Sequence, residues 1–301
     1  VGLCTGAILC CFAAVYIKTV IIPEAGAVDL SQFAVGENSV MYYMDQDTGN
    51  YRELVTLAAE ENAEWVNYED IPEDLINATV AIEDRFWEHN GVDWKRTAAA
   101  ILYMFTGQDI QGGSTITQQL IKNLTQYDDV TVKRKVIEIF RALQFDKDYT
   151  KETTLEWYLN FIWLGDRCRG VGAAAMNYFG KPVQELTLAE CASLISITNN
   201  PTIYGPYSDA VFTNSETGEQ KTARDKNKER QELVLWSMLD QGYITQEEYD
   251  EAVAQELVFD RAAGESTPST IYSWYEEQVI SDVKDDLKAQ YGYSDEAVSL
   301  L

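Results

Sequence analysis

The pattern of apolar and polar residues predicts helices over most of the chain. Apolar side chains recur at helical spacing from residue 72 onward, for example at Val132, Val136, Ile139, Phe140 and Leu143. The segment SVMYYMDQDTGNYRELVTL, residues 39–57, instead alternates with the two-residue period of a strand. Because Asp-Thr-Gly-Asn lies at its centre, we expect a β-hairpin there.

Polar residues and glycines mark the expected helix boundaries. Pro72 opens a helix that should run to Arg85, and Thr150 caps one that should close at Gly165. Asp93 is expected to cap a helix through residues 98–102, and Gly180 to end another. Polar residues 207–226 read as a loop, and residues 271–290 as a last helix. Three threonine-led tetrads have the pattern of a capping box: Thr115–Gln118, Thr187–Glu190 and Thr245–Glu248.

The first 22 residues form an apolar run, interrupted by Thr5, Lys18 and Thr19. A membrane span needs about 20 predominantly apolar residues. We therefore expect residues 1–22 to be a transmembrane helix that is truncated at its start. The alternatives are a buried helix and a signal-peptide core, although the run shows neither a basic leader nor a clear cleavage site.

Five cysteines and one histidine limit the available chemistry. Three cysteines lie in the apolar run, whereas Cys168 and Cys191 lie beyond it. The last two are either a disulfide or two buried thiols, and neither has the C-x-x-C spacing of a zinc site. His89 is the single imidazole base, and no nucleophile motif stands beside it.

Negative charge dominates the chain, with 49 acidic residues against 23 basic ones and a formal net charge of −26. Because a phosphate backbone needs a basic face, the composition argues against nucleic acid as a partner. The basic residues are nevertheless concentrated in one region, where they could hold an anion. They include Lys122, Lys133, Arg134, Lys135, Arg141, Lys147 and Lys151.

Three short clusters carry candidate chemistry. Residues 83–94, EDRFWEHNGVDW, begin with two carboxylates, and the aromatic residues that follow would desolvate a carboxylate and make it a stronger base. Residues 112–123, GGSTITQQLIKN, combine glycines, hydroxyls and amides with a lysine. In RKVIE, Arg134 and Glu138 share one helical face. Taken singly, the clusters also fit a helix end, a capping box and a surface ion pair.

Taken together, the clusters resemble the principal motifs of the family 51 glycosyltransferases, which are the peptidoglycan polymerase domains of class A penicillin-binding proteins and of monofunctional transglycosylases. GGSTITQQ-x-x-KN is complete at residues 112–123, and R-K-x-x-E follows at 134–138. YTKETTLEWYLN and GVGAAAMNYFGK come next, in the expected order, and the resemblance extends over residues 71–254. The first motif is met, with a shift in spacing near its aromatic residue, by Glu83, Asp84, Trp87, His89, Gly91 and Asp93.

The resemblance implies a mainly α, lysozyme-like fold with two lobes, a head and a jaw, beside the β-hairpin and the transmembrane helix. It divides the chain into the transmembrane helix at 1–22, a membrane-proximal linker with the hairpin at 23–70, a glycosyltransferase domain at 71–256, and a linker at 257–301 towards an absent transpeptidase domain. The apolar residues 101–105 would belong to the jaw and touch lipid. The protein would then be a single-pass protein of the cell membrane, with its catalytic domain on the extracytoplasmic side.

The resemblance also implies a reaction. Such domains polymerise lipid II into glycan strands, forming β-1,4 bonds with inversion and releasing undecaprenyl pyrophosphate. Glu83 would be the general base towards the acceptor 4-hydroxyl, and Glu138 the second essential glutamate. The residues expected to bind the substrate and its pyrophosphate are Lys122, Arg134, Lys135, Ser114, Thr115, Gln118, Gln119 and Asn123.

A pyrophosphate leaves as a weak base, so the reaction needs cations or a metal rather than a general acid. Some members of the family use a divalent cation, Mg or Mn, and Asp84 is the candidate ligand; no organic cofactor is expected. The expected partners are lipid II, the growing glycan strand, the cytoplasmic membrane and cell-wall synthesis proteins. The alternatives are a lysozyme-like enzyme that cleaves glycan and a non-catalytic, membrane-anchored scaffold.

Overall fold

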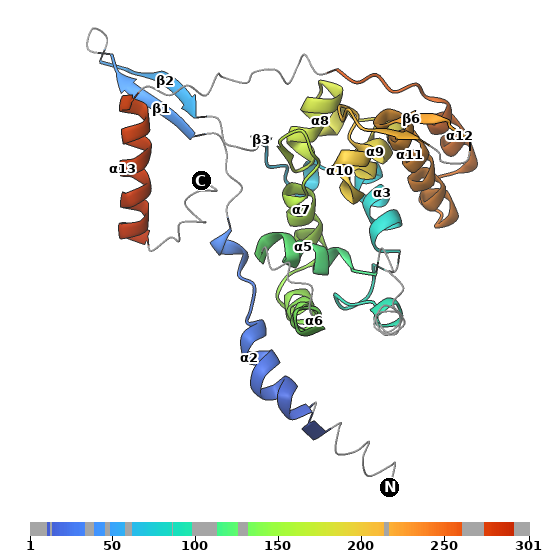
Figure 1. The fold of residues 1–301 in the computed structure, drawn as a ribbon, viewed down its shortest axis with the longest axis horizontal. Helices are drawn as coiled ribbons and strands as arrows, with labels where there is room; N and C mark the ends of the chain where they lie inside the picture. The colour runs from blue at the N-terminus through green and yellow to red at the C-terminus, as the bar shows by residue number, and fades with distance from the viewer. Residues whose placement is uncertain are drawn as a thin grey trace.

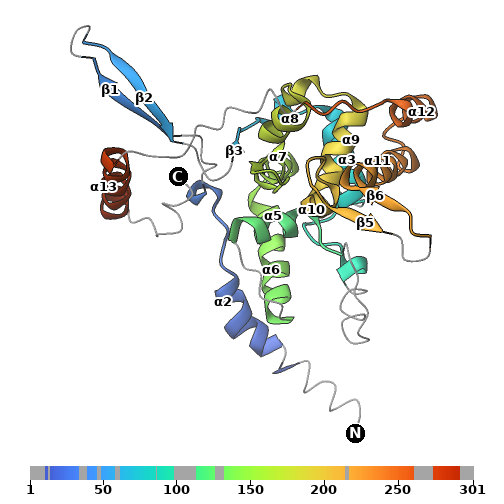
Figure 2. The ribbon, with the colours of Figure 1, turned by 45° about the horizontal axis from the view of Figure 1, so that its top comes forward.

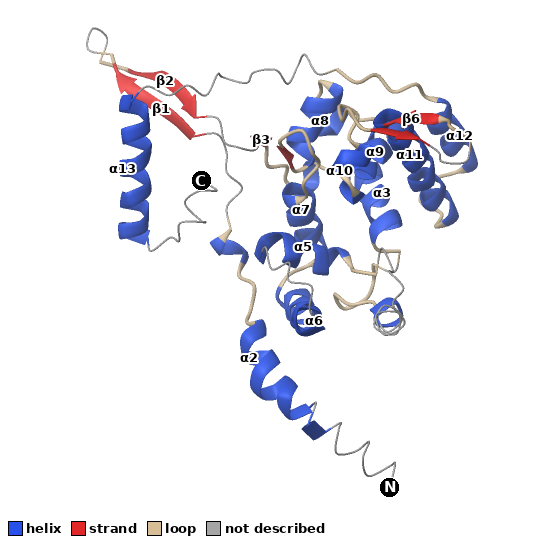
Figure 3. Cartoon of the chain, viewed as in Figure 1, coloured by secondary structure: helices blue, strands red, loops and turns tan. Residues whose placement is uncertain are grey.

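A computed structural model of the chain describes residues 11–12, 14–33, 39–45, 49–57, 62–85, 87–97, 113–125, 132–213, 217–260 and 274–291. This part of the chain is mainly helical, with three small two-stranded sheets (Figure 3). The prediction of a mainly α fold with a β-hairpin is thereby confirmed. The predicted jaw residues 101–105 and Gly112 lie outside the described residues.

The helices of the described part differ widely in length. The longer ones are α3 (Glu73–Glu83), α5 (Ile116–Thr125), α6 (Val132–Asp148), α7 (Lys151–Phe161), α8 (Val171–Phe179), α9 (Leu188–Ser196), α11 (Ala223–Asp240), α12 (Gln246–Ala254) and α13 (Trp274–Tyr291). The shorter ones are η1 (Ile17–Ile21), α2 (Ile22–Ala25), η2 (Leu30–Gln32), η3 (Tyr68–Asp70), η4 (Val183–Glu185), η5 (Ile197–Asn199) and α10 (Pro201–Tyr204).

One continuous apolar core holds the helical body together. Helices α3, α9 and α11 pack against one another, and α5 packs against both α6 and α7 (Figure 1). Leu75, Leu120, Leu159 and Leu194 contribute wholly buried side chains from α3, α5, α7 and α9. Truncation of a leucine in such a position costs about 2–5 kcal/mol. The core therefore fixes the ends of α3, α5 and α9 relative to one another.

A smaller apolar cluster joins the N-terminal helices to α6. Ile21 and Ala25 pack against Ile137, and the Arg141 guanidinium donates a hydrogen bond to the Ala25 carbonyl at 2.6 Å. Within the described residues we find no helix with both the length and the apolar character needed to cross a bilayer. Half of the residues of the transmembrane helix expected over 1–22 lie outside that part, and this helix stays a prediction.

Each of the three sheets has two strands. β1 (Ser39–Met44) and β2 (Tyr51–Leu57) form the predicted antiparallel hairpin, which stands away from the helical body in both ribbon views (Figures 1 and 2). β3 (Asn62–Ala63) pairs in parallel with β4 (Cys168–Arg169). β5 (Val211–Thr213) and β6 (Gln220–Thr222) form a second antiparallel pair.

Three predicted boundaries are wrong. α3 ends at Glu83 rather than at Arg85, because Asp84 leaves the helical conformation, with φ −145° and ψ 66°. α7 ends at Phe161 rather than at Gly165, because Ile162 turns extended and its carbonyl accepts a hydrogen bond from the N–H of Gly170. Residues 207–226, expected as a loop, hold β5, β6 and the start of α11, which opens on a capping box between Thr222 and Asp225.

Most local signals gave the correct structure. Thr150, Thr187 and Thr245 cap α7, α9 and α12, and Gly180 ends α8 in the left-handed conformation. α13 matches the predicted last helix within the residues described there. Asp93 accepts hydrogen bonds from the N–H groups of residues 95 and 96, so it caps a helix as predicted, although residues 98–102 lie outside the described part.

The two cysteines beyond the N-terminal run do not form a disulfide. Cys168 and Cys191 are both buried, and both side chains are thiols. The Cys168 thiol lies 3.5 Å from the Asp166 carbonyl oxygen, and burial raises the pKa of the Cys191 thiol. The two-thiol alternative is therefore correct.

Candidate active site

The Glu83 carboxylate lies where the C-terminal end of α3 meets the first turn of α5. It is half-buried, and each of its oxygen atoms accepts one hydrogen bond. Gln119 Nε2 in α5 donates to Oε2 at 2.8 Å, and the Thr198 hydroxyl in η5 donates to Oε1 at 3.0 Å. The predicted base is thus held between two elements that are distant from it in sequence.

Asp84 ties the loop after α3 to the start of α5. Its side chain is wholly buried; Oδ1 accepts from His89 Nε2 at 2.8 Å and Oδ2 accepts from the N–H of Ile116 at 3.1 Å. Because Ile116 is the first residue of α5, the carboxylate satisfies one of the exposed N–H groups at the positive end of that helix.

The candidate metal ligand does not fit a divalent cation as it is placed. Both oxygen atoms of Asp84 already accept hydrogen bonds, and its carboxylate has no exposed surface. Over the described residues, no group of three or more His, Cys, Asp and Glu side chains could hold a metal ion. Dependence on Mg or Mn stays a prediction.

The first turn of α5 is the predicted capping box. The N–H of Thr115 donates to Gln118 Oε1 at 3.1 Å, and the N–H of Gln118 donates to the Thr115 hydroxyl oxygen at 3.2 Å. The same hydroxyl donates to the Gly91 carbonyl at 2.8 Å. Gly91 has a φ of +81°, and a Cβ atom there would lie 2.5 Å from the Ala142 carbonyl oxygen of α6. A glycine is therefore required where this loop crosses α6.

A second polar group joins α6 to the same turn of α5. Glu138 is buried, and its two oxygen atoms pair with Arg134, at 2.7 Å, and with Lys135. Lys135 Nζ also donates to the Ser114 hydroxyl at 2.8 Å and lies 3.5 Å from Gln118 Oε1. Two cations facing one carboxylate leave an excess positive charge beside α5. Such an arrangement can bind an anion.

The remaining predicted site residues lie further along α5. Lys122 is exposed and borders a small pocket with Arg134, Glu138 and Arg141. Asn123 is half-buried. The structure thus brings Glu83 and Gln119 into one group, and Ser114, Gln118, Arg134, Lys135 and Glu138 into another. Because Gln118 and Gln119 are neighbours in sequence, a single turn of α5 connects the two groups.

Two residues of the Glu83 group were not predicted. Tyr158 in α7 donates to Gln119 Oε1 at 3.3 Å, and Thr198 bonds Glu83 directly. Tyr158 lies inside the quoted stretch YTKETTLEWYLN, so its motif could have pointed to it. Thr198 lies 115 residues from Glu83 in the chain, and no pattern marked it.

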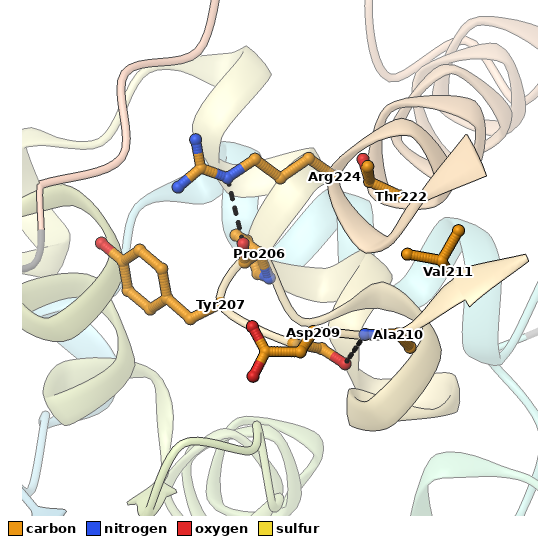
Figure 4. Close-up of a pocket in the computed structure, with 8 residues that line it drawn as sticks. Pro206, Tyr207, Asp209, Ala210, Val211, Thr222 and Arg224 are labelled. Atoms are coloured by element: carbon orange, nitrogen blue, oxygen red, sulfur yellow. Dashed lines mark hydrogen bonds between the residues drawn. The ribbon is translucent and has the colours of Figure 1, made fainter. Parts of the chain in front are cut away.

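A separate hollow lies between the end of α10 and the start of α11 (Figure 4). It measures about 440 Å³, and the Arg224 Nε atom on its border donates to the Pro206 carbonyl at 3.0 Å. None of the predicted site residues borders it. The hollow is therefore distinct from the Glu83 group.

Comparison with known proteins gives one family. A sequence model of the family described as "Transglycosylase" matches residues 50–239. "Penicillin-binding protein 1A" of Clostridium botulinum (strain Hall) is 39% identical over 274 residues, which are 87% of this chain and 31% of that protein. "Penicillin-binding protein 1A" of Aquifex aeolicus is 44% identical over 195 residues, which are 64% of this chain and 25% of that protein. The chain thus spans less than a third of the length of these relatives.

The solved structures include a more distant match. The crystal structure of penicillin-binding protein 1A from Haemophilus influenzae is 23% identical and covers 87% of this chain and 26% of that one. The TM-score is 0.38, which is too low to support an argument about the fold.

Proposed function

The chain belongs to the transglycosylase family, and we propose that it polymerises lipid II into the glycan strands of peptidoglycan. The proposed reaction forms β-1,4 bonds with inversion and releases undecaprenyl pyrophosphate. The observation that carries the proposal is the arrangement around α5. One turn of this helix holds the Glu83 carboxylate on one side and the Arg134, Lys135 and Glu138 group on the other.

In the proposed reaction, Glu83 is the general base. It takes the proton from the acceptor 4-hydroxyl while that oxygen attacks C1 of the growing chain. The bond from C1 to the pyrophosphate oxygen breaks, and this oxygen keeps the electron pair. Because the attack comes from the face opposite to the leaving group, the anomeric centre is inverted.

The cations stabilise the departing pyrophosphate. Arg134 and Lys135 are held in place by Glu138, so their positive charges are already oriented before substrate binds. Lys122 is exposed one helical turn beyond Gln118 and Gln119, and its ammonium group can reach an anion from solvent. This role for Glu138 is that of an orienting residue rather than a second base.

The proposed location follows from the substrate. Lipid II is anchored in the cytoplasmic membrane, and the apolar residues at the start of the chain would hold the domain beside it as a single-pass anchor. The catalytic domain would then face the extracytoplasmic side, where cell-wall synthesis proteins are available as partners.

Incubation of the purified chain with lipid II in detergent tests the proposal. We expect glycan strands to form, and Glu83→Gln to lower the rate by about 10²–10⁴-fold without changing the thermal unfolding midpoint. Glu88→Gln is the matched control, because Glu88 is an exposed carboxylate of the loop that follows α3. Normal polymerisation by Glu83→Gln would refute the assignment, and cleavage of preformed glycan without growth would favour the lysozyme-like alternative.

A further inference from the structure

We propose that Tyr158 and Thr198 are positioning residues that hold the two oxygen atoms of Glu83 in different ways, so that Oε1 is the oxygen that receives the substrate proton. This inference rests on the proposed function, because it takes Glu83 as the general base. It goes further in two ways. It assigns roles to two residues that lie outside the three clusters at 83–94, 112–123 and 134–138. It also distinguishes the two oxygen atoms of the Glu83 carboxylate.

Two successive hydrogen bonds, from Tyr158 to Gln119 and from Gln119 to Glu83, fix the Oε2 side; we call this pair the relay. A carboxylate oxygen can only accept a hydrogen bond, so Gln119 must present its Nε2 group to Glu83 and keep its Oε1 for Tyr158. Tyr158 is 1% exposed. Its burial, followed by the charges of Glu83 and Asp84, raises the pKa of the phenol well above its ordinary value. The phenol therefore remains a donor. A flip of the Gln119 amide would place its oxygen against the Glu83 carboxylate, which is unfavourable.

The relay makes Oε2 a poor place for a proton. The Gln119 Nε2 group has hydrogens but no lone pair that can accept a hydrogen bond. A protonated Oε2 would therefore lose a charge-assisted hydrogen bond and would have no acceptor on that side. The relay consequently leaves Oε2 in the role of a hydrogen-bond acceptor.

The Oε1 side can reverse its hydrogen bond. The Thr198 hydroxyl oxygen lies 3.0 Å from Glu83 Oε1 and 2.8 Å from the Ile195 carbonyl oxygen, but it has only one hydrogen to donate. When Glu83 is ionised, the hydroxyl donates to Oε1. When Oε1 carries the proton, the hydroxyl turns to the Ile195 carbonyl, and its lone pair accepts a hydrogen bond from Oε1.

The proton transfer to Glu83 requires no further group. The proton leaves the acceptor 4-hydroxyl and stays on Glu83 Oε1, while the electron pair of the O–H bond remains on the sugar oxygen that bonds to C1. No covalent bond of Thr198 forms or breaks, since its hydroxyl only rotates. Release of the proton to solvent after the glycan has moved restores the starting state.

Four variants of the complete chain, assayed with lipid II, test the inference. Thr198→Val keeps the shape of the side chain without its hydroxyl, and we expect kcat to fall about 10–100-fold with KM within about twofold of wild type. Thr198→Ser keeps the hydroxyl and should retain kcat within about threefold. Tyr158→Phe frees the Gln119 amide and should lower kcat as Thr198→Val does. Thr202→Val, on exposed Thr202 of α10, is the matched control and should behave as wild type.

The outcomes separate this inference from the proposed function. If Thr198→Val keeps the wild-type kcat, or if Thr198→Ser loses as much activity as Thr198→Val, the hydroxyl has no role and the inference is wrong. If Thr198→Val does not fold, as judged by its thermal midpoint, Thr198→Ala replaces it as the variant without a hydroxyl. A wild-type chain that fails to polymerise lipid II overturns the proposed function, and the inference falls with it.

Discussion

The Asp84 carboxylate, next to the candidate base, uses both of its oxygen atoms for hydrogen bonds that hold the fold together. Its removal would leave the half-buried His89 ring nitrogen and the N–H of Ile116 without their acceptors. We expect Asp84→Ala to lower the free energy of unfolding by about 2–4 kcal/mol, because each buried donor left unpaired costs about 1–3 kcal/mol. Asp84→Asn should cost less, since its amide oxygen still accepts. Urea unfolding measures both, with the exposed Glu88→Ala as control.

The same variant also tests the predicted metal site. If Asp84→Ala unfolds like the wild type but its polymerisation no longer responds to Mg²⁺ or Mn²⁺, then Asp84 holds a metal in the working enzyme. A destabilised Asp84→Ala together with an unchanged metal response in Asp84→Asn supports the structural role instead. The unfolding measurement is therefore needed to distinguish a structural role of Asp84 from a metal-binding role, because activity alone falls in both cases.

Among the elements, those set by local signals could be predicted and those set by contacts across the fold could not. The capping box of Thr115 and Gln118 was read from four adjacent residues and is present. The end of α3 was misplaced by two residues, because the side chain of Asp84 leaves the helix to reach His89 and the start of α5. Only the folded chain reveals those two donors.

The candidate site also combines contacts that local sequence signals predict with contacts that only tertiary packing creates. The ion pair of Arg134 and Glu138 follows from their spacing on one helix. Thr198 and Glu83 meet only because α3, α9 and α11 pack together, and no periodicity encodes that contact. The sequence motifs therefore identified the reacting groups, whereas their supports came from tertiary packing.

The N-terminal helices depend on α6 for their position. Arg141 donates to the Ala25 carbonyl at 2.6 Å, and Lys133 pairs with Glu24 at 2.6 Å. We expect Arg141→Met to raise hydrogen exchange of the amides in residues 17–25, because it removes a charged donor from the last carbonyls of α2. Exchange in α5 should stay as in the wild type. Lys147→Met, an exposed change on the same helix, is the control, and equal exchange in both variants would contradict the coupling.

At the scale of the whole molecule, the basic region from Lys122 to Lys151 lies in an acidic chain and most of its positive charge is paired locally. Glu138 faces Arg134 and Lys135, and Asp146 faces Lys151. Lys133 and Arg141 are occupied by α2. Within the described part of the chain, Lys122 and Lys147 are the exposed members of the basic region that have no partner. Of these two, only Lys122 borders the candidate site.

Lys122 should therefore supply most of the local attraction for an anionic substrate near the site. The net charge of −26 repels a pyrophosphate at long range, and a local cation offsets this repulsion only within about 8 Å at physiological salt. We expect Lys122→Met to raise KM for lipid II about 3–10-fold and to flatten the dependence of the initial rate on NaCl, while kcat changes less. Lys147→Met should leave KM and the salt dependence unchanged. Equal salt dependence in wild type and Lys122→Met would assign the attraction to Arg134 and Lys135, whose charges Glu138 already offsets in part.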